Sequence, residues 1–219
     1  MSTGCLAWSS MEKILDADTC AFVKSGAKYV VLTAKHHDGY ALYPSKYSPP
    51  HWNSMEIGPK RDLVGDLAKA VRERKLEFGL YHSLLEWFHP KYLADKANGY
   101  KTQDFVFSKV WPEMKELIEA FKPSILWSDG EWETLDSYWN STDFLAWLYN
   151  DSIIKDHVVT NDRWGNNTNC AHGGFFNCKD RYMPTEPPKR KWENAMTLDY
   201  ASWGYRRNAG LNDYMNIDG

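Results

Sequence analysis

Residues 29–34 of the 219-residue chain read Tyr-Val-Val-Leu-Thr-Ala, and the polar stretch Lys35-His36-His37-Asp38-Gly39 follows directly. A continuous apolar run of this length is typical of a strand that is buried on both faces, as in a parallel sheet. We therefore predict a buried strand here. Further strand candidates are residues 76–81, 124–127, 157–160 and, less apolar, 196–199.

Helical patterns separate these strands. Residues 10–25 predict a helix that stops at Gly26, a residue suited to the position after a helix C-terminus. Asp62 can cap a helix with apolar residues on one face, and Pro112 suits the first turn of another. Strands that alternate with helices indicate an α/β fold with a parallel sheet. The expected helices after the first are 63–71, 111–121 and 144–149.

Two parallel architectures fit this alternation, an open doubly wound sheet and a (β/α)₈ barrel. The first candidate strand lacks the Gly-rich phosphate turn of a nucleotide-binding sheet. Polar residues follow every strand, as the C-terminal face of a barrel requires. We predict a (β/α)₈ barrel. We expect it to be incomplete, because only about five of its eight strands can be recognised in the sequence and a full barrel needs about 250 residues. No linker or repeat divides residues 1–219, which form one domain.

The bulk composition excludes some partners. The formal net charge is −3, which gives no electrostatic basis for binding nucleic acid or an anionic membrane. No apolar run approaches the roughly 20 residues that span a bilayer.

Cysteines and sequons bear on the compartment. The four cysteines do not form a zinc pattern; Cys170 and Cys178 either close a short disulfide loop or stay reduced. Sequons at Asn140, Asn150 and Asn166 favour a secreted or lysosomal protein. The first five residues show no signal peptide, so we expect the natural N-terminus to lie upstream.

The residues after the strands suit a sugar ligand. Histidine, tyrosine and arginine bind hydroxyl groups, tryptophan stacks on the ring, and carboxylates attack or transfer protons. Each also has a plainer interpretation. His36 and His37 could be structural or bind a metal, although neighbouring strand residues point to opposite faces. Asp129 could cap a helix, Arg163 could form a surface ion pair, and Trp127 could belong to the core. The combination favours a sugar site.

Glycoside hydrolysis needs two carboxyl groups that flank the scissile bond, and their separation decides between retention and inversion. The sequence does not give this separation. It offers Asp129 at a strand end, with Asp162, Asp180 and Glu193 downstream.

Several motifs resemble glycoside hydrolase family 29, the α-L-fucosidases. They are residues 28–39, 79–87, 126–132, 161–165, 191–193 and 202–207, and the likeness covers about residues 22–216. The resemblance implies a (β/α)₈ barrel, a retaining mechanism through a covalent fucosyl-enzyme, and neither metal nor cofactor. It implies that the partners are fucosylated glycans of glycoproteins and glycolipids, in a lysosomal or secreted setting. The intact enzyme is either a monomer or a homo-oligomer, and the sequence does not distinguish the two.

The resemblance also implies residue roles. Asp129 matches the nucleophile in the motif Trp127-Ser128-Asp129-Gly130. For the acid/base we prefer Asp180, since the acid of related enzymes follows the Asn-Asp-Arg strand end at a short distance. Glu193 is the alternative, because burial beside Trp192 would raise its pKa. The implied substrate-binding residues are His36, His37, Tyr81, Trp127, Arg163 and Trp203.

The chain also departs from the family. The His-Trp-Gly strand end and a pocket-lining Glu have no counterpart in residues 1–20, and the last strand and C-terminal β-sandwich do not follow Gly219. Unpaired strand edges favour aggregation, so we expect this chain alone to be unstable and poorly active. A rival interpretation is a catalytically inactive fucose-binding fragment or pseudoenzyme.

Overall fold

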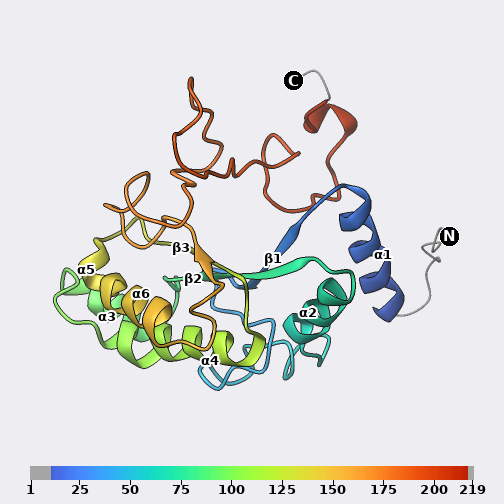
Figure 1. Cartoon of the computed structure of the whole chain (residues 1–219). Helices are drawn as coiled ribbons and strands as arrows, with labels where there is room; N and C mark the ends of the chain where they lie inside the picture. Colours follow the sequence, from blue (N-terminus) through green and yellow to red (C-terminus); the bar gives the residue numbers. More distant parts are fainter. Residues whose placement is uncertain (1–10, 217–219) are drawn as a thin grey trace.

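Four parallel strands form a single sheet in the structure, a computed structural model that describes residues 11–216, with side chains from residue 18 onward (Figure 1). Cys5 lies outside the described residues. The strands lie side by side in chain order, and each neighbouring pair is parallel. The predicted α/β fold with a parallel sheet is therefore confirmed. The strands are β1 (Tyr29–Lys35), β2 (Glu77–Ser83), β3 (Ile125–Asp129) and β4 (Val159–Thr160).

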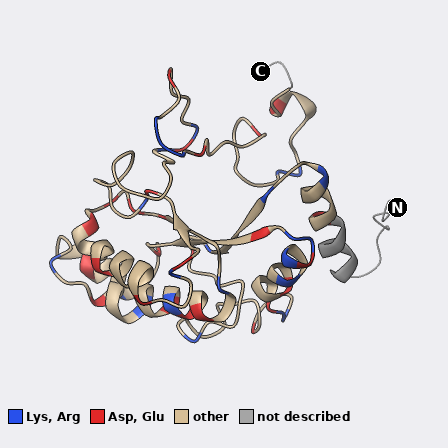
Figure 2. Ribbon diagram, in the orientation of Figure 1, with Lys and Arg blue, Asp and Glu red and all other residues tan. Residues whose placement is uncertain are grey.

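The helices that precede β4 in the chain cover one side of this sheet, and the segment that follows β4, with its 3₁₀ turn, lies on the other side (Figure 1). Basic and acidic residues are interspersed along the helices and loops, in keeping with the small net charge (Figure 2). Within residues 11–216, no helix has the length and apolar character needed to cross a bilayer. The helices are α1 (Met11–Lys24), α2 (Leu63–Glu73), α3 (Pro90–Ala97), the π-helical turn η1 (Val106–Val110), α4 (Trp111–Phe121), α5 (Asp136–Trp139), α6 (Ser141–Asn150) and the 3₁₀ turn η2 (Leu211–Asp213).

The predicted helix signals act as expected. The Asp62 carboxylate caps α2 by accepting a hydrogen bond of 2.9 Å from the backbone N–H of Gly65. Val64 and Val71 on α2 are fully buried and pack with the β2 side chains into one core cluster. α4 has a proline in its first turn and ends at Phe121, and the next residue, Lys122, caps it in the left-handed conformation at φ 47°. Capping and one apolar face thus fix both helices against the sheet.

Three strand predictions need correction. β1 is not buried on both faces: Tyr29 is 46% exposed, because β1 is the edge of the described sheet and pairs with β2 alone. β4 is shorter than predicted, because the N–H groups of His157 and Val158 bond to Ile154 in a turn. The candidate at 196–199 is not a strand; its Asp199 forms one isolated bridge with Tyr214.

Candidate active site

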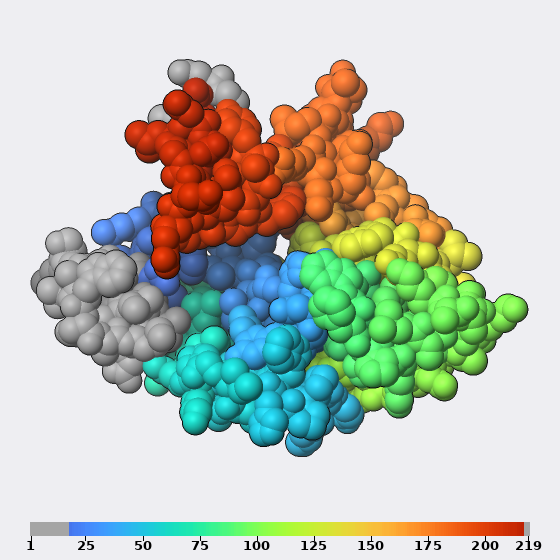
Figure 3. All heavy atoms as spheres, turned by 180° about the vertical axis from the view of Figure 1, so that it is seen from behind, coloured from blue at the N-terminus to red at the C-terminus, as the bar shows by residue number. Residues whose placement is uncertain are grey.

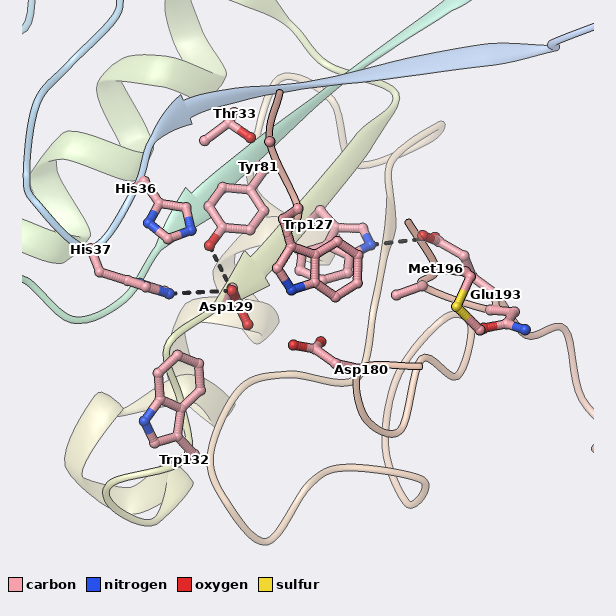
Figure 4. A pocket seen from close by; sticks show the side chains of 14 residues that line it. Thr33, His36, His37, Tyr81, Trp127, Asp129, Trp132, Asp180, Glu193 and Met196 are labelled. Atoms are coloured by element: carbon pink, nitrogen blue, oxygen red, sulfur yellow. Dashed lines mark hydrogen bonds and ion pairs between the residues drawn. The ribbon is translucent and has the colours of Figure 1, made fainter. Parts of the chain in front are cut away.

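The carboxyl ends of β1, β2 and β3 open into a cavity of about 600 Å³ (Figure 4). In the register, Ser83 at the end of β2 lies opposite Asp129 at the end of β3. The other wall belongs to the segment after β4, which forms a raised layer, orange to red, over the rest of the chain (Figure 3). Parallel α/β folds bind ligands at this edge of the sheet. The predicted site residues that line the cavity are His36, His37, Tyr81, Trp127, Asp129, Asp180, Glu193 and Trp203.

Both carboxylate oxygens of Asp129 accept a hydrogen bond from a neighbouring side chain. Its Oδ2 accepts a hydrogen bond of 2.6 Å from the hydroxyl of Tyr81, and its Oδ1 accepts one of 2.9 Å from Nη1 of Arg163. Burial, together with the Asp129 charge, raises the pKa of Tyr81 above its usual range, so the phenol keeps its proton and donates. The carboxylate is therefore fixed in orientation while it faces the cavity. It is not a helix cap.

Gly130 allows the chain to turn sharply after Asp129. Its φ is +82°, and a Cβ there would lie 2.9 Å from Cγ of Leu85. A side chain at position 130 would thus be strained both by the backbone conformation and by lack of space. The strand end can present its carboxylate because the next residue is glycine.

His37 connects the nucleophile candidate to β2. Its Nδ1 lies 2.6 Å from Oγ of Ser83, whose own proton goes to the carbonyl of Leu85. Nδ1 must then be the donor, which assigns the proton to Nδ1. Burial and the neighbouring His36 lower the pKa of His37 to about 4, so the ring is neutral near pH 7. Nε2, which lies 3.6 Å from Asp129, is left with a lone pair to accept a hydrogen bond.

His36 belongs to a stack of flat groups along the cavity wall. Its ring stacks on Tyr81 with centroids 5.5 Å apart, and Tyr81 stacks on Trp127 at 5.4 Å. The guanidinium of Arg163 lies 4.9 Å from the Trp127 ring centroid. Trp203 lines the rim and is 55% exposed. The stack holds the hydrogen-bonding groups of the wall rigid.

The alternation argument against joint ligation by the two histidines is wrong. β1 ends at Lys35, so His36 and His37 lie beyond the strand, and both line the cavity. They and Asp129 offer ligand atoms within 4.8 Å of one another. The Asp129 oxygens are, however, already bound by Tyr81 and by the cationic Arg163, which would repel a metal ion. This donor set fits a metal poorly.

One guanidinium joins two carboxylates. Arg163 follows β4 and binds Asp129 through Nη1 and Asp180 through Nη2, at 2.9 Å and 2.6 Å. The Arg163 side chain is 5% exposed, whereas that of Asp180 is 54% exposed. Asp180 therefore stands at the mouth of the cavity, linked to Asp129 through a buried cation.

Glu193 occupies a different position on the same wall. Its Oε2 accepts a hydrogen bond of 3.3 Å from Nε1 of Trp127. Burial raises the pKa of the Glu193 carboxyl group, as predicted. The tryptophan that Glu193 contacts is, however, Trp127, whose hydrogen bond acts in the opposite direction, and not the exposed Trp192. The raised pKa of Glu193 suits a proton donor. Asp180 has a different advantage: Arg163 binds both Asp180 and Asp129 and so holds the two carboxylates near each other.

Asp162, the remaining carboxylate candidate, does not line the cavity. It is fully buried, and its carboxylate accepts hydrogen bonds from the backbone N–H groups of Cys170, Asn177 and Cys178. Cys170 and Cys178 form a disulfide, which resolves the alternative left open by the sequence.

Two features were missed by sequence reasoning. Trp132 lines the cavity and packs edge-on against His37 at 5.1 Å. The signals for it are its position three residues after Asp129 and its place in the motif 126–132. His82 lies within β2 and does not line the cavity; its Nε2 lies 3.1 Å from Oε2 of the buried Glu113.

Glu113 belongs to a buried ion cluster beneath the site. Lys35 binds Glu86 at 2.7 Å and Glu113 at 3.1 Å, and Lys109 binds Glu113 at 2.6 Å. The cluster joins α4 and η1 to the residue that precedes the two cavity histidines. Lys109 and Glu113 are four residues apart, which is a helical pairing signal, but nothing local marks Glu86.

Comparison with known sequences supports one family. A family model described as Alpha-L-fucosidase matches residues 16–218. The chain is 59% identical over 195 residues to tissue alpha-L-fucosidase of Bos taurus, covering 89% of this chain and 42% of the relative. It is 58% identical over 195 residues to an alpha-L-fucosidase of Branchiostoma floridae, covering 89% and 43%. The chain thus spans about two fifths of the length of these curated relatives.

Comparison with solved structures supports the same family. The fold resembles a Thermotoga maritima alpha-L-fucosynthase with a TM-score of 0.72 and 32% identity, over 93% of this chain and 44% of that one. It resembles a further structure named alpha-L-fucosidase with a TM-score of 0.73 and 33% identity, over 93% and 45%.

Proposed function

The chain belongs to the alpha-L-fucosidase family, and we propose that it carries the catalytic carboxylate of a retaining exo-glycosidase that hydrolyses α-L-fucosides. The observation that carries this proposal is the Asp129 carboxylate, which faces the cavity with one oxygen bound by Tyr81 and the other by Arg163. A carboxylate ordered in this way is the nucleophile that a retaining glycosidase needs.

In the first step, Asp129 attacks the anomeric carbon and forms a fucosyl ester. The bond to the departing oxygen breaks, and the acid residue gives that oxygen a proton. In the second step, the same residue takes a proton from water, which attacks the ester and releases L-fucose. Asp129 returns to its ionised form, so protons and charges balance over the cycle.

The cavity wall recognises the sugar hydroxyl groups in this proposal. The neutral His37 accepts a hydrogen bond at Nε2, because Nδ1 is committed to Ser83. His36 offers further polar atoms, and the faces of Trp127 and Trp203 provide apolar surface for C–H groups. Arg163 is not among the lining residues and acts from behind the wall, where its two Nη atoms bind Asp129 and Asp180. Tyr81 keeps its proton and holds the nucleophile.

For the acid/base we propose Asp180, with Glu193 as the alternative. The ion pairs of Arg163 with both Asp129 and Asp180 support the first, and the raised pKa of Glu193 supports the second. Asp180→Asn and Glu193→Gln distinguish them. The acid variant hydrolyses fucosides with poor leaving groups about 10²- to 10⁴-fold more slowly, whereas azide speeds its reaction with good leaving groups. The other variant shows neither effect.

The proposal extends to architecture and setting. Four parallel strands in chain order, with helices on one side, support a catalytic (β/α)₈ barrel of which the described residues form a part. The Cys170–Cys178 disulfide and the exposed sequon asparagines Asn150 and Asn166 support a lysosomal or secreted location. We propose fucosylated glycans of glycoproteins and glycolipids as the partners.

Hydrolysis of an aryl α-L-fucoside by the purified protein tests the proposed activity. Asp129→Gly is expected to abolish turnover, and azide should restore part of it. The rival function, fucose binding without catalysis, is not favoured by the ordered Asp129. Fucose binding with no turnover by the unaltered protein would favour it.

A further inference from the structure

Asp162 is a buried charge for which the proposed mechanism has no use. It is fully buried beside Arg163 and is not among the residues that line the cavity. Its Oδ2 accepts from the N–H groups of Cys170 at 2.7 Å and Cys178 at 3.1 Å, and its Oδ1 accepts from that of Asn177 at 3.0 Å. A buried carboxylate with three backbone donors is a strong local anchor.

The anchored segment, residues 170–178, has no regular secondary structure of its own. Its buried N–H groups need acceptors from elsewhere, and Asp162 supplies them. The segment packs tightly on the end of β4: a Cβ at Gly173 would lie 2.8 Å from the carbonyl oxygen of Asn161. The disulfide then closes the loop. The carboxylate therefore helps to fix where this segment lies on the sheet, together with the carbonyl of Thr160, which accepts from the N–H groups of Gly174 and Phe175.

Both candidate acids depend on the anchored segment. Asp180 comes two residues after Cys178. Glu193 is tied to the segment through Phe176, whose N–H bonds to Lys191 at 2.9 Å and whose carbonyl accepts from Glu193 at 2.8 Å. Whichever acid donates the proton, its position is transmitted from Asp162 through residues 176–178.

We propose that Asp162 is a positioning residue that holds the acid/base segment over the nucleophile. Two neighbouring residues then fix the two halves of the reaction, since Arg163 binds Asp129 while Asp162 binds the segment that carries the acid. The inference rests on the proposed glycosidase function and is independent of which residue is the acid.

The variant Asp162→Asn tests this inference, because it keeps the shape but turns one acceptor oxygen into a donor that faces N–H groups. We compare kcat/KM for phenyl α-L-fucoside, a poor leaving group, and 2-chloro-4-nitrophenyl α-L-fucoside, a good one. The expected loss is about 100-fold for the first and under about tenfold for the second, since only the first needs a proton from the acid. Equal losses on both would overturn the inference.

Asp95→Asn is the matched control. Asp95 is also buried and accepts from the backbone N–H of Phe105 and from the hydroxyl of Tyr138, away from the cavity. Its variant should lose stability without changing the ratio of the two kcat/KM values. If Asp162→Asn does not fold, Asp162→Glu gives the same comparison with the charge retained.

Hydrogen exchange separates this inference from the proposed function. In Asp162→Asn, the amides of residues 170–178 should exchange faster than in the unaltered protein, while those of β2 and β3 should not. Unchanged exchange in the segment would contradict the anchoring role. If the unaltered protein hydrolyses neither fucoside, the glycosidase proposal fails, and the exchange result alone decides whether Asp162 anchors the segment.

Discussion

The hydroxyl of Tyr81 donates a hydrogen bond of 2.6 Å to Oδ2 of Asp129, across the pair of neighbouring strands β2 and β3. The bond exists because the register brings Tyr81 opposite Trp127, two residues before Asp129. A phenol that keeps its proton orients the carboxylate without neutralising it.

Removing this hydroxyl should slow the reaction while leaving the fold intact. Tyr81→Phe is expected to lower kcat/KM about 10- to 100-fold, since a hydrogen bond to a charged group is worth about 1.5–3 kcal/mol. Steady-state kinetics on an aryl fucoside measure it. Tyr40→Phe is the control, because its hydroxyl donates to the carbonyl of Ile57 outside the cavity. Equal effects of the two variants would show that the Asp129 bond has no special role.

The protonation of His37 gives a spectroscopic prediction. Its pKa is lowered to about 4, so the ring should stay neutral at pH 6, with the proton on Nδ1 facing Ser83. ¹⁵N NMR of the imidazole distinguishes this tautomer from its alternatives. In Ser83→Ala the proton loses its acceptor, and KM should rise several-fold. A cationic ring at pH 6, or a proton on Nε2, would contradict the assignment.

Glu193 predicts a pH dependence of stability. Burial raises the pKa of Glu193 in the folded state. The contribution of Glu193 to the free energy of unfolding is therefore fully present below its unfolded-state pKa of about 4.3, and it is lost as the pH rises through the raised folded-state pKa. In Glu193→Gln, the free energy of unfolding should therefore fall less between pH 4 and pH 7 than in the unaltered protein. Urea unfolding at both pH values measures this, with the exposed Glu186→Gln as control. Identical pH dependence in all three proteins would refute it.

The buried ion cluster predicts a large loss of stability. Glu113→Gln leaves Lys35 and Lys109 short of a counter-charge in a site with almost no exposure. Breaking one partner of a buried pair costs about 3–5 kcal/mol of the free energy of unfolding. Glu119→Gln, on the exposed face of the same helix, should cost almost nothing. A loss below about 1 kcal/mol for Glu113→Gln would show that the cluster is dispensable.

Local sequence signals predicted much of the fold. The apolar runs that became β1, β2 and β3 and the capping by Asp62 each act within a few residues, so they can be read directly. The exposure of Tyr29 could not be read in this way, because it depends on which strands lie beside β1. The failed strand at 196–199 has a similar cause: no neighbouring strand pairs with it along its length.

The candidate site followed from strand ends and motif resemblance, since carboxyl ends of parallel strands meet at one edge. The resemblance favoured Asp180 over Asp162, but the residue types alone could not separate them, because both are carboxylates near the same strand end. Their contacts in the structure separate them: the Asp162 carboxylate accepts hydrogen bonds from backbone N–H groups, whereas Asp180 lines the cavity. Glu86 in the ion cluster was equally unreadable, since its partner Lys35 lies 51 residues away.

Covalent trapping tests the nucleophile most directly. A 2-deoxy-2-fluoro-fucosyl fluoride should form a stable ester, because fluorine at C2 slows both steps, whereas the good leaving group at C1 speeds formation of the ester but has no effect on its hydrolysis. Mass spectrometry of the digested protein should then locate one added fluorofucosyl group on the peptide that contains Asp129. An adduct on a different carboxylate, or turnover of fucosides with no adduct at Asp129, would contradict the account.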